Sequence, residues 1–116
     1  MEVQGISWLG VRTDRFEEML RLFRDVMGLD PVRSEGGFAA LKASNGDLVE
    51  LFGPQSAVNR HFGPAPVAGF AVADFAAALE ELKAAEVEVV HVHSDPGNRS
   101  WAHFRARDNT LYEITG

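Results

Sequence analysis

The chain contains no cysteine, and this absence excludes disulfides, zinc-thiolate sites and cysteine nucleophiles. No apolar run approaches the roughly 20 residues that a membrane-spanning helix needs. The opening residues, MEVQGISW, lack the basic and then apolar layout of a signal peptide. We therefore expect a cytoplasmic protein that does not enter a membrane.

An excess of positive charge is also missing, because 17 acidic residues outnumber 11 basic ones and the net charge is −6. This balance disfavours nucleic acids and anionic membrane surfaces as general partners. No glycine-rich phosphate loop leads from a strand into a helix, and no serine lies in a nucleophile-elbow context. What is present is an ordinary globular composition, with 46% apolar and 24% charged residues in 116, enough for one domain with its own core.

Residues 4–53 have the pattern of a strand, a helix and three more strands. The stretch ISWLGVRT alternates like a half-buried strand, and Asp14 predicts a capping box at the start of a helix that ends near Gly28. Three short strands follow, and Asn45-Gly46 predicts the hairpin between the last two.

The same order recurs in residues 66–116, after a proline-rich connector of residues 54–65. VAGFAVAD reads as a strand, Asp74 caps a second helix, and EVEVVHVH, WAHFRAR and LYEIT read as three further strands. Neither βαβββ module can bury both its sheet and its helix alone, so we expect one domain with a shared core. The predicted fold class is α+β, with two tandem βαβββ modules.

Two glutamates occur in matching contexts, Glu50 in NGDLVELFGP and Glu113 in NTLYEITG. Each stands between apolar residues of a predicted strand, and successive residues of a strand point to opposite faces of the sheet. The helices should cover the apolar faces, so both carboxylates should point away from them. The polar and aromatic side chains of these opposite faces are candidates for ligand binding: Trp8, Arg12, Glu50, Trp101, His103, Arg105 and Glu113.

The two glutamates also have a structural explanation. They can be solvated, or they can pair with the cations of the same faces, Arg12, Arg105 or Lys42. The two tryptophans can likewise pack in a core or a dimer interface instead of stacking on a ligand.

The histidines leave similar alternatives open. His103 can carry a proton or a hydrogen bond beside the neighbouring aromatic side chain, or it can be purely structural. His91 and His93 share one face of a predicted strand, as either a chelating pair or an exposed face leading into a loop.

Four runs carry a family resemblance when they are taken in order: WLGVRTDRFEEMLRLFRDVMGLDPV, NGDLVELF, VAGFAVADFAAALEELKAAEVEVV and FRARDNTLYEI. Together they resemble the vicinal oxygen chelate superfamily, which includes glyoxalase I, ring-cleaving dioxygenases and bleomycin-resistance proteins. The resemblance covers nearly the whole chain. It implies curved mixed sheets that enclose a cleft, often completed by a homodimer. In metal-using members a divalent cation binds to the first and last strands of the modules, commonly through histidine or glutamine first and glutamate last.

The sequence departs from that pattern at the first-strand positions, which fall on Trp8 and Val67. Neither side chain can ligate a metal. Glu50 and Glu113 stand at the last-strand positions, so the resemblance leaves at most a weakly bound divalent cation on these two carboxylates. We expect no other cofactor.

These observations favour a protein that binds a small organic molecule in a cleft lined by tryptophan and glutamate, without a tightly bound metal. A bleomycin-resistance-like sequestering protein is one form of it. The alternative is a divalent-metal-dependent lyase, isomerase or dioxygenase-like enzyme with Glu50 or Glu113 as general base. A third interpretation is an interaction module with a vestigial cleft. The sequence leaves open whether a reaction is catalysed and whether the modules pair within one chain or across a homodimer.

Overall fold

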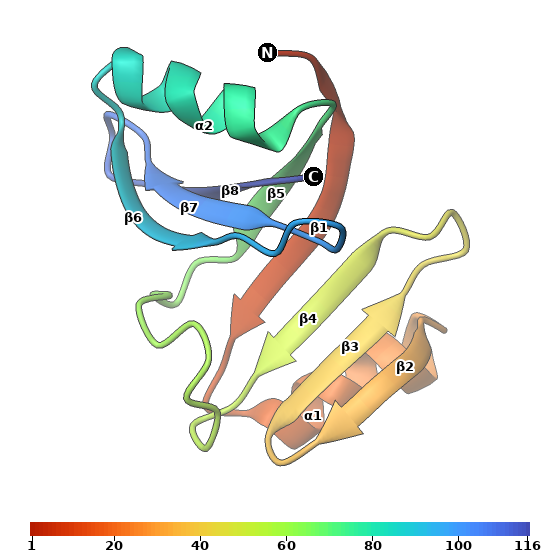
Figure 1. Cartoon of the computed structure of the whole chain (residues 1–116). Helices are drawn as coiled ribbons and strands as arrows, with labels where there is room; N and C mark the ends of the chain where they lie inside the picture. Colours follow the sequence, from red (N-terminus) through yellow and green to blue (C-terminus); the bar gives the residue numbers. More distant parts are fainter. The chain divides into compact units, whose positions relative to one another are not determined.

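The computed structural model describes all residues from Met1 to Gly116, and the chain divides into two units. One unit consists of residues 7–67, and the other combines residues 1–6 with residues 68–116. Each contains one βαβββ module, so the predicted α+β class with two tandem modules is confirmed. The strands and the two α-helices are labelled in Figure 1.

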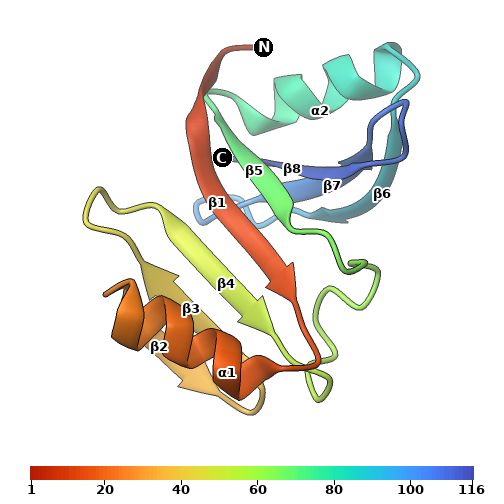
Figure 2. The ribbon, with the colours of Figure 1, turned by 180° about the vertical axis from the view of Figure 1, so that it is seen from behind.

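The first module forms a four-stranded mixed sheet in the order β2-β3-β4-β1. Strands β1 and β4 are parallel, and the other neighbours are antiparallel. Helix α1 lies against one face of this sheet (Figure 2). The elements are β1 (Val3–Arg12), α1 (Phe16–Arg21), the π-helix η1 (Leu22–Val26), β2 (Asp30–Glu35), β3 (Phe38–Lys42) and β4 (Leu48–Phe52).

The core of the first module lies between α1 and the sheet. Leu20 of the helix packs in one cluster with Leu41 and Leu51, and Val49 packs against the same cluster. Val49 and Leu51 flank Glu50 on β4, so alternation directs the Glu50 side chain to the opposite face. The predicted direction of this carboxylate is therefore confirmed.

The second module repeats the arrangement with a sheet in the order β5-β8-β7-β6. Strands β5 and β8 are parallel, whereas β8, β7 and β6 are antiparallel to one another. The start of the chain belongs to this unit, and the Met1 amino group pairs with Glu81 of helix α2. The elements are β5 (Val67–Val72), α2 (Phe75–Ala84), β6 (Glu88–His93), β7 (Trp101–Arg105) and β8 (Leu111–Thr115).

The core of the second module lies under α2. Leu79 and Leu82 of the helix pack with Ala102 and Ile114 of the sheet. Because Ile114 faces the helix, its neighbour Glu113 points to the other face of β8, as predicted. Burying these side chains stabilises each module by about 1.5–3 kcal/mol per large aliphatic residue.

The two helices begin differently. Asp74 caps α2 as predicted, since its side chain accepts a hydrogen bond from the Ala77 backbone N–H at 3.0 Å. The predicted capping box at Asp14 is wrong, because α1 starts after Arg15 with no side-chain cap, and the Arg15 N–H instead donates to Thr13 Oγ1. No helix of the structure has the length and apolar character required to cross a membrane.

Candidate functional site

In the first module, Glu50 is held by an indole. The Nε1–H of Trp8 on β1 donates to Glu50 Oε1 on β4 at 2.7 Å. The two strands are adjacent, with Trp8 opposite Leu48 and Gly10 opposite Glu50, so the bond runs diagonally across the ladder. The Trp8 donor is buried, with 4% exposure, whereas Glu50 is half-buried.

Gly10 provides the space in which the Trp8 indole lies. A Cβ built on Gly10 would come within 2.1 Å of Trp8 Cη2 and 2.8 Å of Phe62 Cε2. Phe62 belongs to the connector, and its ring meets Trp8 edge-on at a centroid distance of 6.1 Å and Phe52 at 5.9 Å. The connector therefore packs an aromatic ring onto the face of the first sheet that carries Glu50.

In the second module, Glu113 is held by an imidazole. His103 and Glu113 are directly opposite in the β7–β8 ladder, with His103 Nε2 at 2.9 Å from Glu113 Oε2. The exposed fractions are 0% for His103 and 3% for Glu113, so both polar groups are removed from solvent. The same relation thus occurs in both modules, because each glutamate meets a ring nitrogen of a neighbouring strand.

Two pairs of stacked rings lie on β6 and β7, on the face of the second sheet that carries His103 and Glu113. The rings of His91 and His103 stack at 5.5 Å, and those of His93 and Trp101 stack at 4.0 Å. The β6–β7 register places these residues opposite each other in the same pairs. The two exposed histidines of β6 are therefore packed against rings of β7.

The buried histidine is neutral at neutral pH. Burial lowers the pKa of His103 to about 4, because an imidazolium is poorly solvated away from water. Burial is also the main cause of the lowered pKa of His91, followed by the charges of His103 and His93. A neutral imidazole has one donor and one acceptor nitrogen, so His103 can donate to a carboxylate and still accept a hydrogen bond.

We expect the fold to lose stability as the pH falls through the interval between the unfolded and folded pKa values of His103, 6.5 and about 4. The unfolded chain takes up the proton first, so the stabilising contribution is complete above pH 6.5 and lost toward pH 4. The free energy of unfolding should be about 2 kcal/mol lower at about pH 5 than above pH 6.5. Urea unfolding at stepped pH measures it, and His103→Gln should flatten the curve over this interval. An equally steep curve for the variant would refute the assignment.

The two predicted arginines contact backbone rather than the glutamates. Arg12 Nη2 donates to Ser56 O at 2.9 Å, and Arg12 Nη1 donates to Val58 O at 3.1 Å, so this side chain fixes the connector. Arg105 Nη1 donates to Asn109 O at 3.4 Å in the turn between β7 and β8. Neither arginine forms an ion pair with a carboxylate.

The side chains present do not compose a metal centre. No group of three or more histidine, aspartate and glutamate side chains is arranged to hold an ion. At the first-strand position of the first module, the Trp8 indole nitrogen is a donor only, and it is directed at Glu50. The His91 and His103 rings are nearly parallel, at 23°, instead of directing their nitrogens toward one point.

Sequence reasoning missed Phe62. It lies among the prolines and glycines of the connector, where no strand or helix periodicity assigns a direction to a side chain. The available signal was the composition of the connector, because Phe62 is the one large aromatic residue in residues 54–65. Its ring contacts with Trp8 and Phe52 show that the connector is packed against the first module.

Comparisons with known proteins place this arrangement among related folds. A methylmalonyl-CoA epimerase from Mycobacterium tuberculosis has 19% identity and a TM-score of 0.74, with 97% of this chain and 87% of that chain covered. A Mn(II)-bound glyoxalase from Novosphingobium aromaticivorans has 22% identity and a TM-score of 0.75, with 97% of this chain and 38% of that chain covered. A member of the glyoxalase/bleomycin resistance protein/dioxygenase superfamily from Vibrio splendidus 12B01 has 14% identity and a TM-score of 0.68, with 98% of each chain covered.

No curated protein sequence matches the chain significantly. A family model does match, over residues 5–114, and its description is Glyoxalase/Bleomycin resistance protein/Dioxygenase superfamily. The match spans nearly all of both βαβββ modules, including the strands that carry Glu50 and Glu113. The chain therefore belongs to the glyoxalase/bleomycin resistance protein/dioxygenase superfamily.

Proposed function

We propose that the protein binds a small organic molecule on the face of the first sheet that lies opposite helix α1. The group that binds it is the Glu50 carboxylate, which is held by the Trp8 indole nitrogen in place of a tightly bound metal. The observation that carries this proposal is the 2.7 Å hydrogen bond from Trp8 to Glu50. At the position where metal-using relatives are expected to carry a first-strand ligand, this chain has an N–H donor that already occupies one oxygen of the glutamate.

The surroundings of Glu50 indicate the kind of molecule. Trp8 occupies Oε1, while Oε2 can accept a further hydrogen bond from a ligand N–H or O–H. Aromatic rings stand beside the carboxylate, and the net charge of the chain is −6. A molecule with a flat apolar part and a protonated amine fits this combination. We further propose that the protein is a cytoplasmic homodimer that sequesters such a molecule, as bleomycin-resistance proteins do.

A matched pair of probes tests the proposal. Phenethylamine and its neutral analogue 2-phenylethanol are titrated against the Trp101→Phe variant, in which Trp8 is the only indole. We expect the amine to change Trp8 emission and to bind about tenfold more tightly than the alcohol. Glu50→Gln should remove this difference. Glu35→Gln, which removes the same charge from an exposed strand, should preserve it.

A metal-dependent lyase, isomerase or dioxygenase-like enzyme is the second candidate. It is favoured by the glutamates on the last strands of both modules, and the similar structures include a Mn(II)-bound glyoxalase and a methylmalonyl-CoA epimerase. Thermal melting with Mn²⁺, Ni²⁺ or Zn²⁺ separates the two candidates. One-to-one stabilisation that disappears in Glu50→Gln would support the enzyme and overturn the metal-free proposal, whereas unchanged melting would support the latter.

A further inference from the structure

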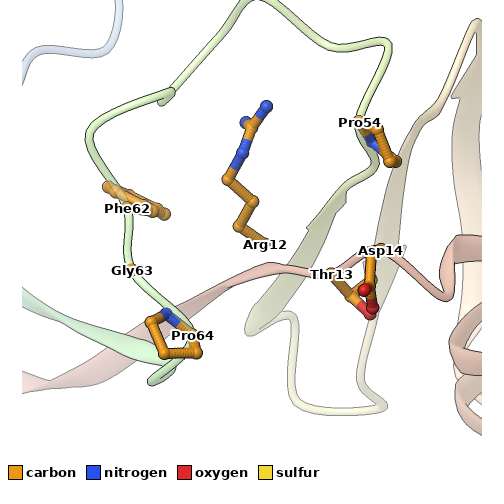
Figure 3. Close-up of a pocket in the computed structure, with 7 residues that line it drawn as sticks. All are labelled: Arg12, Thr13, Asp14, Pro54, Phe62, Gly63 and Pro64. Atoms are coloured by element: carbon orange, nitrogen blue, oxygen red, sulfur yellow. The ribbon is translucent and has the colours of Figure 1, made fainter.

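An open hollow of about 440 Å³ lies within the first module, where β1 ends and the connector begins. Figure 3 shows Arg12 in the middle of it, with Phe62 and Pro64 on one side and Pro54 and Asp14 on the other. This volume is within the range of about 300–1,000 Å³ that small-molecule sites occupy. Three of the residues that line it carry apolar rings, namely Pro54, Phe62 and Pro64. Arg12 and Phe62 lie on the same side of the first sheet as Glu50, but neither Trp8 nor Glu50 lines the hollow.

The Arg12 guanidinium keeps hydrogen-bonding capacity in this hollow. A guanidinium has five N–H donors. Three of them meet the carbonyl oxygens of Ser56, Val58 and Asn59, the last at a long 3.5 Å. The structure gives no protein acceptor to Nε–H or to one N–H of Nη2. Nε and Nη2 share one edge of the group, and such an edge can bind both oxygens of a carboxylate.

We propose that this hollow binds a small organic monoacid, whose carboxylate pairs with Arg12 and whose flat apolar part lies against Phe62, Pro54 and Pro64. Arg12 has no carboxylate partner within the chain, so its charge is available to an anion. Asp14 at the rim repels a second negative charge on the ligand. The hollow therefore favours a monocarboxylate over a dicarboxylate or a phosphate ester.

Binding of an anion in the hollow can be followed by the fluorescence of Trp8. Arg12 holds the connector by its carbonyl oxygens, and the connector carries Phe62, whose ring meets the Trp8 indole. An anion that pairs with Arg12 and packs on Phe62 therefore changes the environment of Trp8. Both proposed ligands contact the Phe62 ring. They differ in charge, because an amine would pair with Glu50 and a carboxylate would pair with Arg12, so the titrations with phenethylamine and with benzoate can fail independently.

Benzoate tests the site, with benzamide as its neutral analogue of the same shape and phthalate as the dicarboxylate. In the wild-type protein, benzoate should shift the NMR resonances of the Arg12 Nε–H and of the Phe62 ring. It should bind about tenfold more tightly than benzamide or phthalate. Trp8 emission, measured in Trp101→Phe, should follow the same titration. Equal binding of benzoate and benzamide, or shifts confined to other residues, would overturn the proposal without any variant being needed.

Substitutions then assign the charge. Arg12→Gln should weaken benzoate about tenfold while leaving benzamide unchanged. Arg12→Lys should bind benzoate more tightly than Arg12→Gln but more weakly than the wild type, because an ammonium cannot donate two parallel N–H bonds to one carboxylate. Arg60→Gln removes the same charge from an exposed connector position that does not line the hollow, and it should bind benzoate like the wild type. If Arg60→Gln weakened benzoate as much as Arg12→Gln, general charge attraction would explain the binding and the site would be refuted.

Discussion

Replacing His103 with leucine should lower the free energy of unfolding by about 3 kcal/mol at neutral pH. The substitution removes the ring nitrogen that lies 2.9 Å from Glu113 Oε2, while the carboxyl group stays in a position that is only 3% exposed. A buried carboxyl group that loses a hydrogen-bond partner is costly, because water cannot replace the missing contact. Urea unfolding of the wild type and the variant at one pH measures the difference.

Two further variants separate this effect from a simple loss of packing. His93→Leu removes an imidazole that also stacks on a ring of β7 but is exposed, and it should cost less than about 1 kcal/mol. The double variant His103→Leu/Glu113→Leu should be more stable than His103→Leu alone, because no polar group is then left at the pair. If the double variant were no more stable than the single one, the hydrogen bond would not be the source of the effect.

Much of the fold could be predicted because strand alternation and helix periodicity act over short distances. Val49 and Leu51 on either side of Glu50 were enough to assign the direction of that carboxylate, and Tyr112 and Ile114 did the same for Glu113. A cap is harder to predict, since it depends on the dihedral angles of one residue. Asp74 directly precedes α2 and caps it, whereas Asp14 lies two residues before α1 and leaves the N-cap position to Arg15.

The hydrogen-bond partners of the glutamates could not be predicted. Strand alternation gives the face of the sheet on which a side chain lies, but it does not give the atoms that the side chain contacts. Arg12 shares a face with Glu50, yet its long side chain extends to carbonyl oxygens of the connector. Trp8 lies closer to Glu50 because Gly10 lets the indole lie along the strand. Phe62 was missed for the related reason that a loop's packing depends on contacts far away in the chain.

Replacing Gly10 with alanine should cost about 2–3 kcal/mol, a large effect for the addition of one methyl group. Its backbone does not adopt the left-handed conformation that favours glycine, so the penalty is steric, from a Cβ within 2.1 Å of the Trp8 ring and 2.8 Å of Phe62. Displacing the indole also breaks its bond to Glu50, so Trp8 emission in Trp101→Phe should shift toward that of a hydrated indole. Gly63→Ala is the matched control, because a Cβ there meets no atom within 4 Å and should be nearly neutral. Equal stability of the two alanine variants, with unchanged emission, would mean that the indole does not lie over Gly10.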